Sequence, residues 1–170
     1  MIRLPINATT WLLLGALASA ALLAGAYAFQ YLGGYAPCEL CWTQRYIHFA
    51  ALAVGAAGFA LATRRPNVAR PACLLLGLVF VASTIVAAYH AGIEWKWWPG
   101  PAGCTGGHVG TITAADMAKL LSGNIGHIVQ CDEAAWRLVG ISMAGYNAVI
   151  SLVLAALSLV EGAYRADHRG

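Results

Sequence analysis

The chain has 170 residues, of which 60% are hydrophobic and only 10% are charged, and its mean hydropathy is +0.67. A soluble globular domain carries about 25% charged residues, so this composition excludes an ordinary water-soluble domain. The net charge of +3 does not call for a nucleic-acid partner, because arginines in the connections between apolar runs account for it.

Four apolar runs follow one another along the chain. Each is 18 to 23 residues long and free of Asp, Glu, Lys and Arg: 11–32, 46–63, 71–89 and 138–160. About 20 apolar residues are needed to cross the hydrocarbon layer as a helix. We therefore expect an all-α membrane protein, a four-helix transmembrane bundle that forms one domain over residues 1–170. The expected spans are about 11–32, 45–63, 71–90 and 138–160, and the expected outer loops are about 33–44 and 91–137.

The first run also has the features of a secretory signal. Arg3 precedes it, and Ala26-Tyr27-Ala28 has the small-x-small pattern of a cleavage site. Its charge-free stretch is longer than the roughly 7–15 apolar residues of a typical signal, which favours an uncleaved span. Topology leaves this alternative open, because an uncleaved signal and a first span orient the remaining helices identically.

The positive charges predict the orientation. With the N-terminus inside, six of the ten Lys and Arg residues are cytoplasmic, and Arg64, Arg65 and Arg70 share one short connection. The positive-inside rule then places both termini in the cytoplasm. The six tryptophans lie at or near the ends of expected spans, where amphipathic rings prefer the membrane interface.

The first outer loop contains Cys38 and Cys41 in a C-x-x-C spacing. A bridge across two intervening residues closes a very small ring, restrains little and tends to be reducible, so this pair indicates redox chemistry and not a structural disulfide. Pro37 restricts Ala36 to extended conformations before the turn. The second span begins near Cys41, and a helix N-terminus favours a thiolate there.

Arg45 lies one helical turn after Cys41, on the same face of the second span. A guanidinium at the lipid boundary is costly unless it is paired or reaches the headgroups. Arg45 could therefore stabilise a thiolate or bind an anionic ligand, or it could simply extend to the headgroups.

The second and third spans contribute two histidines and a cysteine. His48 lies about one turn from Arg45, His90 ends the third span on the outer side, and Cys73 lies near its cytoplasmic end. We expect Cys73 to be a small buried residue. Such histidines are more often satisfied interfacial groups than ligands, yet both lie near the depth of Cys41. With no nucleotide-binding glycine motif and no facing histidine pair of a haem site in the sequence, a membrane quinone is the simplest electron acceptor.

The second outer loop, about 91–137, is expected to have two different halves. Its first half is rich in Trp, Pro and Gly and is predicted to run extended near the membrane surface. Thr113–Asn124 has a capping-box-like start and a Gly-Asn stop, with Met117, Leu120 and Leu121 on one helical face. This pattern predicts a short amphipathic helix, either on the outer leaflet or packed on the bundle.

The same loop carries Cys104 and Cys131, so both cysteine pairs face an oxidising compartment, where disulfides persist. Gly and Pro flank Cys104 and leave it accessible to a cysteine of another protein, and Cys131 follows downstream to resolve the mixed disulfide. We expect two exchanges in series, in which a partner dithiol reduces Cys104–Cys131 and the resulting dithiol reduces Cys38–Cys41.

Two other uses of the outer cysteines are a structural metal site and structural disulfides. A structural zinc site would use four thiolates, or His108 or His127 in place of one, but a single C-x-x-C matches that pattern poorly, and we expect no metal. A non-enzymatic membrane protein whose disulfides only brace its loops is the second alternative.

Three motifs in this order, "CELCWTQRY", "YHAGIEW" with "GPAGC", and "CDEAAWRLVGISMAGYN", resemble the disulfide bond formation protein B (DsbB) family over essentially the whole chain. The resemblance implies a quinone-dependent protein-disulfide oxidoreductase of the bacterial inner membrane. It implies periplasmic redox loops, a periplasmic DsbA-like thiol oxidase as the partner, and ubiquinone or menaquinone as the acceptor. A vitamin K epoxide reductase-like protein would carry its two cysteine pairs in the opposite order.

The resemblance also implies a role for each site residue. Cys104 would be attacked by the partner, Cys131 would resolve, Cys38 would receive the electrons, and Cys41 would contact the quinone as a thiolate. Arg45 would bind the quinone. His90, and His48 by its depth in the bundle, are further candidates for the quinone site.

Overall fold

The computed structural model describes residues 7–101 and 131–163. Within them lie four long helices, a 3-10 turn and a two-stranded hairpin: α1 (Ala8–Tyr31), α2 (Glu39–Ala62), η1 (Pro66–Val68), α3 (Ala69–Glu94), β1 (Arg137–Leu138), β2 (Ile141–Ser142) and α5 (Met143–Ala163). In these two ranges, four helices are long and apolar enough to cross a membrane. This confirms the expected all-α membrane bundle. The expected amphipathic helix at Thr113–Asn124 lies outside the described residues.

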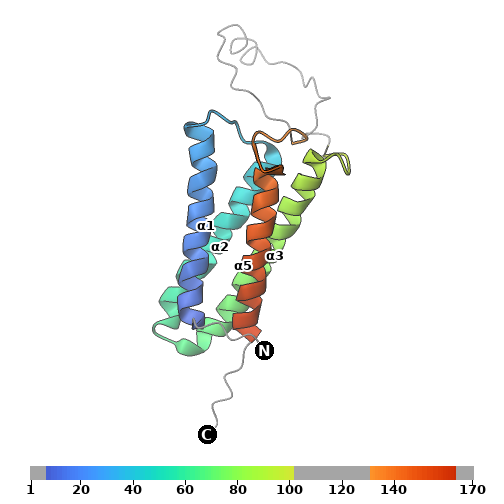
Figure 1. Cartoon of the computed structure of the whole chain (residues 1–170). Coiled ribbons are helices and arrows are strands. Elements are labelled where there is room, and N and C mark those ends of the chain that lie inside the picture. Colours follow the sequence, from blue (N-terminus) through green and yellow to red (C-terminus); the bar gives the residue numbers. More distant parts are fainter. Residues whose placement is uncertain (1–6, 102–130, 164–170) are drawn as a thin grey trace.

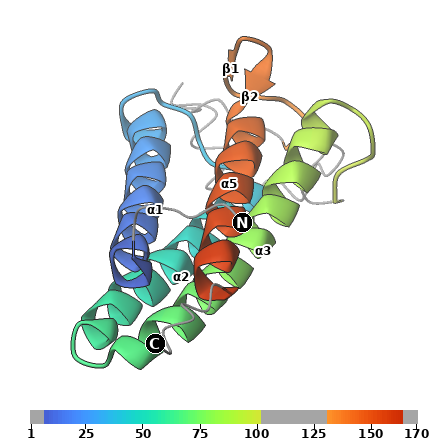
Figure 2. The ribbon, with the colours of Figure 1, turned by 60° about the horizontal axis from the view of Figure 1, so that its bottom comes forward.

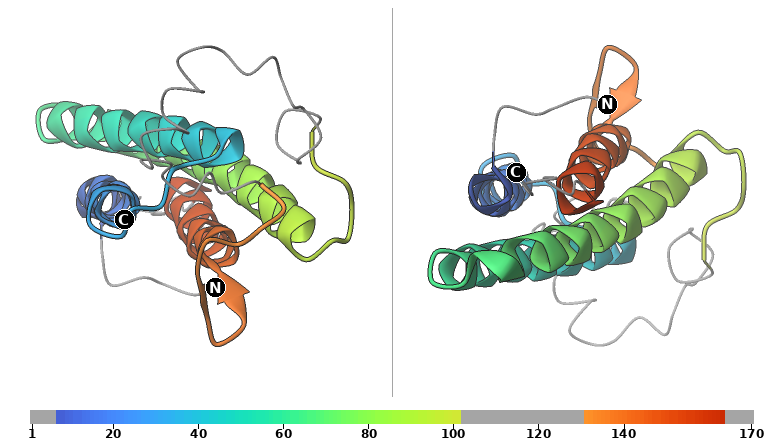
Figure 3. Two further views of the ribbon diagram at one scale, coloured as in Figure 1. Left: turned by 90° about the horizontal axis from the view of Figure 1, so that it is seen from above. Right: turned by 90° about the horizontal axis from the view of Figure 1, so that it is seen from below.

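The four helices run alternately up and down (Figure 1). The start of α1, the α2–α3 connection and the end of α5 lie together at one end of the bundle. Seen along the bundle, α1 and α5 lie on the same side of the α2–α3 pair (Figure 3). The most extensive packing is that of α3 on α5, followed by that of α1 on α2.

The helix starts have local causes. The Asn7 side chain caps α1 by accepting a hydrogen bond from the Thr10 backbone N–H at 2.8 Å. Cys38 has an extended backbone, and its sulfur accepts from the Cys41 backbone N–H at 3.3 Å, so α2 begins at Glu39. The helix N-terminus therefore lies close to Cys41, as the sequence predicts, and the expected span from 45 begins inside α2.

The ends of the outer loop also differ from expectation. α3 continues to Glu94, and α5 begins only at Met143. Before α5, Val139 and Gly140 have φ values of 51° and 80°, and the chain turns there between β1 and β2 (Figure 2). Left-handed residues cannot continue an α-helix, so the apolar run from 138 starts as a hairpin.

The half of the bundle near the α2–α3 connection is filled by close apolar packing. Leu12, Leu76 and Phe80 are fully buried there. A Cβ added to Gly55 would come within 2.8 Å of the Leu12 carbonyl oxygen, so this glycine lets two helix backbones approach closely. Cys73 is also fully buried, and its Sγ lies 3.4 Å from the Ala8 carbonyl oxygen, as expected for a small core residue.

Candidate redox site

Two cysteines meet where the chain enters α2. Cys38 and Cys41 are free thiols, and the Cys38 Sγ donates a hydrogen bond to the Cys41 Sγ at 2.9 Å. This hydrogen bond, together with burial, holds the pKa of the Cys38 thiol above its ordinary value. Cys38 therefore keeps the shared proton, and Cys41 is the sulfur on which negative charge is favoured.

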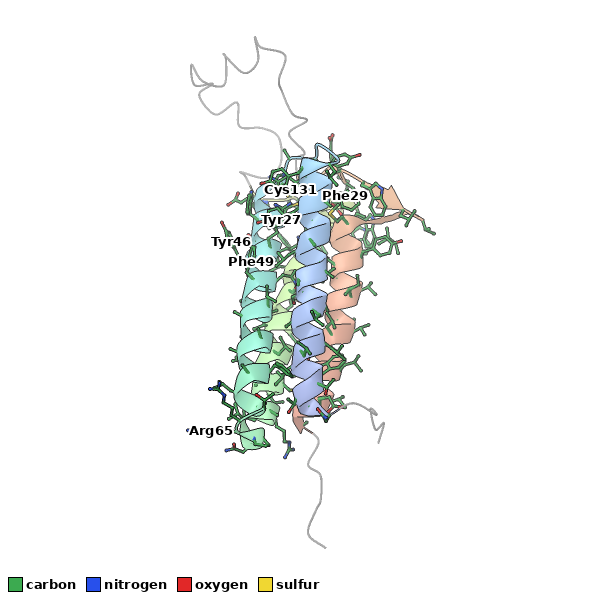
Figure 4. All side chains as sticks on the ribbon, turned by 90° about the vertical axis from the view of Figure 1, so that its left-hand side faces the viewer. Tyr27, Phe29, Tyr46, Phe49, Arg65 and Cys131 are labelled. Atoms are coloured by element: carbon green, nitrogen blue, oxygen red, sulfur yellow. The ribbon has the colours of Figure 1, made fainter. Side chains whose placement is uncertain are left out.

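A third cysteine lies against this pair. Cys131 is completely buried and disulfide-bonded. Its sulfur, the Cys38 sulfur and a ring nitrogen of His90 all lie within 4.8 Å of one another. Figure 4 shows Cys131 at the end of the bundle opposite Arg65. The fold thus brings together cysteines from the two outer loops, whereas Cys104 lies outside the described residues.

This group of two sulfurs and one imidazole has the donor atoms of a metal site. In the observed state, however, the Cys131 sulfur is part of a disulfide and is not a thiolate ligand. The arrangement suits attack of one sulfur on another.

The segment that carries Cys131 is held to the end of α3. Lys96 Nζ donates to Asp132 Oδ2 at 2.8 Å, and Arg137 Nη2 donates to the Glu94 carbonyl oxygen at 3.1 Å. The hydrogen bond from Lys96 holds the pKa of the Asp132 carboxyl below its ordinary value. These contacts hold the segment that carries Cys131 against the C-terminal end of α3, close to His90.

Arg45 is buried, with only 6% of its surface exposed. Its Nη1 donates to the Gln30 side chain, and its Nη2 donates to the Ala26 carbonyl oxygen at 3.0 Å. The guanidinium carbon lies 4.7 Å from the centre of the Tyr27 ring and 5.0 Å from that of Trp42. Arg45 is therefore held between α1 and α2 by these contacts.

A cavity of about 400 Å³ adjoins the cysteines. Residues from α1, α2 and α5 supply most of its wall, and apolar side chains such as Leu22, Phe29 and Ile150 dominate it. The four residues expected at the quinone site all line this cavity: Cys41, Arg45, His48 and His90. Its size and its few convergent polar groups are typical of a small-molecule site.

Two amides on the cavity wall were not found from the sequence. Gln44 Nε2 donates to His90 Nδ1 at 2.8 Å, and Asn147 Nδ2 donates to Gln44 Oε1 at 2.7 Å. Both lie inside transmembrane helices, where an uncharged amide is costly unless it has partners. The signal in the sequence is a neutral amide within an apolar run, which carries no charge and no reactive group to mark it.

Glu94 is a third residue that the sequence did not single out. It is buried on the cavity wall, and its Oε1 lies 3.9 Å from His90 Nε2. Among the described residues, its Oε2 has no hydrogen-bond partner. The sequence predicts Glu94 in the outer loop, whereas α3 continues to Glu94 and places it beside His90.

Comparisons with known proteins identify the family of the chain. A family model described as disulfide bond formation protein DsbB matches residues 8–161. The disulfide bond formation protein B of Methylococcus capsulatus is 30% identical over 157 residues, which cover 91% of this chain and 94% of that relative. No solved structure matches the chain.

Proposed function

Since the chain belongs to the disulfide bond formation protein DsbB family, it is a multi-pass membrane protein of disulfide bond formation, and we propose that it reoxidises a periplasmic DsbA-type thiol oxidase. In this proposal the electrons pass to a membrane quinone. The protein lies in the bacterial inner membrane with both termini in the cytoplasm. The arginines at the α2–α3 connection support this orientation, because they lie at the end of the bundle opposite Cys131 (Figure 4).

The observation that carries the proposal is the apposition of Cys131 and Cys38. A disulfide-bonded sulfur lies within 4.8 Å of a sulfur of a C-x-x-C dithiol. Thiol–disulfide exchange requires this approach of a thiolate to a disulfide sulfur. A purely structural disulfide would not need a reactive pair beside it.

The exchange begins at the outer loop. A partner thiolate attacks Cys104, a bond forms between the partner and Cys104, and Cys131 leaves as a thiolate. The second partner thiolate then breaks that mixed disulfide, so the partner is oxidised and Cys104 and Cys131 become a dithiol. Two electrons and two protons have entered the chain.

The second exchange reduces the C-x-x-C pair. The Cys131 thiolate attacks Cys38 of the Cys38–Cys41 disulfide, and Cys41 leaves as a thiolate. Cys104 then attacks Cys131, which restores the outer disulfide and releases Cys38. This step would leave Cys131 bonded and Cys38 and Cys41 as thiols, which is also the pairing in the structure.

The cavity fits a quinone headgroup. It is mostly apolar, it has the volume of a small-molecule site, and Cys41 forms part of its wall. When bound, ubiquinone or menaquinone would accept the electron pair of the Cys38–Cys41 dithiol. In the described part of the chain Arg45 donates to Gln30 and Ala26, and a further N–H of its guanidinium would donate to a quinone carbonyl oxygen. His90 and His48 would complete the polar part of the site.

The test is turnover in detergent. Purified protein is mixed with a reduced DsbA-type oxidase and a soluble quinone, and quinone absorbance is followed. We expect reduction by the wild type and by the matched control Cys73→Ser, and none by Cys41→Ser. Absence of reduction by the wild type, or undiminished reduction by Cys41→Ser, would contradict the proposal.

A further inference from the structure

Six side chains from three helices and the start of α2 are joined end to end by hydrogen bonds along the cavity wall. We call them the polar row, in this order: His48, Asn147, Gln44, His90, Cys38 and Cys41. The successive donor–acceptor distances are 2.8, 2.7, 2.8, 3.7 and 2.9 Å. The exchange chemistry above uses the cysteines and assigns no task to the amides.

The two amides determine in which direction the hydrogen bonds of the polar row donate. Gln44 accepts through Oε1, so its Nε2 is the donor to His90 Nδ1. An Nδ1 that accepts leaves the proton of the neutral imidazole on Nε2. That nitrogen lies 3.7 Å from the Cys38 sulfur, and His90 also hydrogen-bonds to the Cys131 backbone, so His90 donates toward Cys38 and shares its proton with a second acceptor.

The hydrogen bond at the His48 end of the polar row donates in the same direction. Asn147 Oδ1 can only accept, so His48 Nε2 is the donor in their hydrogen bond. Ser151 Oγ also donates to Asn147 Oδ1, at 3.2 Å. Every link therefore donates toward Cys41, and hydrogen bonds aligned in this way polarise one another in a low-dielectric interior.

We propose that Gln44, Asn147 and His48 are positioning residues that stabilise a thiolate at Cys41. They act through His90 and Cys38, and they do not touch the Cys41 sulfur themselves. The inference rests on the proposed function in one respect, that the electron pair leaves the protein from Cys41. It adds that side chains of the transmembrane helices, as far away as His48, stabilise the thiolate form of Cys41.

Other charged or titratable groups surround the sulfurs and must stay constant in a test. Among the described residues they are Arg45 on α2, Glu94 on α3, Tyr146 on α5, and Tyr35, Cys131, Glu133 and Arg137 in the connecting segments, and Cys131 is a thiol in the reduced protein. Arg45 and Glu94 interact electrostatically with Cys41 with opposite signs. The test variants therefore replace neutral groups only.

The experiment measures the alkylation rate of Cys41 in the reduced, full-length protein in detergent. Iodoacetamide reacts with the thiolate, and peptide mass spectrometry reports Cys41 separately from the other cysteines. In Gln44→Met, which keeps the side-chain length but has no amide, the pH profile should move up by about 0.5–1 unit. The rate near neutral pH should then fall about three- to tenfold.

Asn147→Leu breaks the row one link further away and should produce a smaller shift in the same direction. Because the row needs each link, the double variant should shift no further than Gln44→Met alone. Ser158→Ala is the matched control. Ser158 is a buried serine that accepts a hydrogen bond from Trp11 at the opposite end of the bundle, and its removal should leave the profile unchanged.

An unshifted profile in Gln44→Met or Asn147→Leu variants with native circular dichroism would overturn the inference. An equal shift in Ser158→Ala, or additive shifts in the double variant, would overturn it as well. The assay contains neither quinone nor partner. A shifted profile in a protein that fails to reduce quinone would contradict the proposed function alone, and an active wild type with unshifted variants would contradict the positioning alone.

Discussion

The half of the bundle beside the α2–α3 connection and the half that carries the cysteines are built from the same apolar helices. In the first, Leu12, Leu76 and Phe80 are fully buried and pack closely. In the second, the buried side chains include Arg45 and His90, and they surround a cavity. We infer that the packed half supplies stability and the polar half supplies chemistry, so substitutions in each should change different measured quantities.

The hydrogen bonds of buried polar side chains also differ between the two halves. In the packed half, Trp11 Nε1 donates to Ser158 Oγ at 2.9 Å, and Ser158 donates to the Leu154 carbonyl oxygen at 2.6 Å. These bonds end at the backbone and satisfy the groups locally. In the cysteine half, the hydrogen bonds continue from side chain to side chain until they reach Cys41, as expected if they serve that sulfur.

The largest effect is expected at Cys38. Cys38→Ser removes the sulfur that meets Cys131, so quinone reduction should fall by about a thousandfold or more. A serine can still cap α2, so the unfolding midpoint should stay near that of the wild type. Turnover and thermal unfolding measured on one preparation check this. A large loss of stability with the activity retained would reverse the assignment of the two halves.

Arg45→Met should come next. It removes two hydrogen bonds and two ring contacts from the cavity wall, and it should raise the KM for quinone by about 10- to 100-fold. Arg70→Met is the matched control, because Arg70 donates to the Ala163 carbonyl oxygen at the opposite end of the bundle. Equal KM changes in the two variants would mean that the polar half has no special part in quinone binding.

A backbone contact in the packed half should show the opposite pattern. Gly55→Ala places a Cβ 2.8 Å from the Leu12 carbonyl oxygen and should lower the free energy of unfolding by about 1–3 kcal/mol, with KM unchanged. Gly25→Ala is the control, since an added Cβ there has nothing within 4 Å. Denaturant unfolding of both variants provides the comparison. Equal stability of the two would argue against close packing at Gly55.

The smallest effect is expected at the Lys96–Asp132 pair, which is largely exposed on its lysine side. The lowered pKa of Asp132 means that the pair stabilises the protein above the ordinary Asp pKa of about 4 and that this stabilisation is lost as the pH falls. Lys96→Met should cost about 0.2–1 kcal/mol near neutral pH and almost nothing near pH 2. A difference that grows on acidification would contradict the assigned sign.

Much of the fold was predictable because a lipid bilayer requires each spanning helix to be a run of about 20 apolar residues. Four charge-free runs predicted four spans, but charge was a poor guide to the ends of helices. Arg45 lies inside α2 since Gln30 and Tyr27 surround it, and α5 begins late because Gly140 forms a turn. Such ends depend on local caps and on contacts with other helices.

The candidate site was predictable where its chemistry is carried by reactive residue types. The spacing and charge of Cys38, Cys41 and Arg45 identified them in the sequence. Gln44 and Asn147 were not identified, because the role of a neutral amide depends on hydrogen-bond partners that only the structure shows. The approach of Cys131 to Cys38 follows from packing between distant segments. The sequence predicted only the order of the two thiol–disulfide exchanges, in which Cys131 reacts with the C-x-x-C pair.

The apposition of Cys131 and Cys38 can be measured directly by trapping. In a variant with Cys41→Ser, Cys104→Ser and Cys73→Ser, only these two cysteines remain, and peptide mass spectrometry after mild oxidation reports whether they are joined. We expect one intramolecular Cys38–Cys131 disulfide in most of the protein, because their sulfurs lie within 4.8 Å. Two free thiols in a folded protein would contradict the transfer of electrons from the outer loop to the C-x-x-C pair.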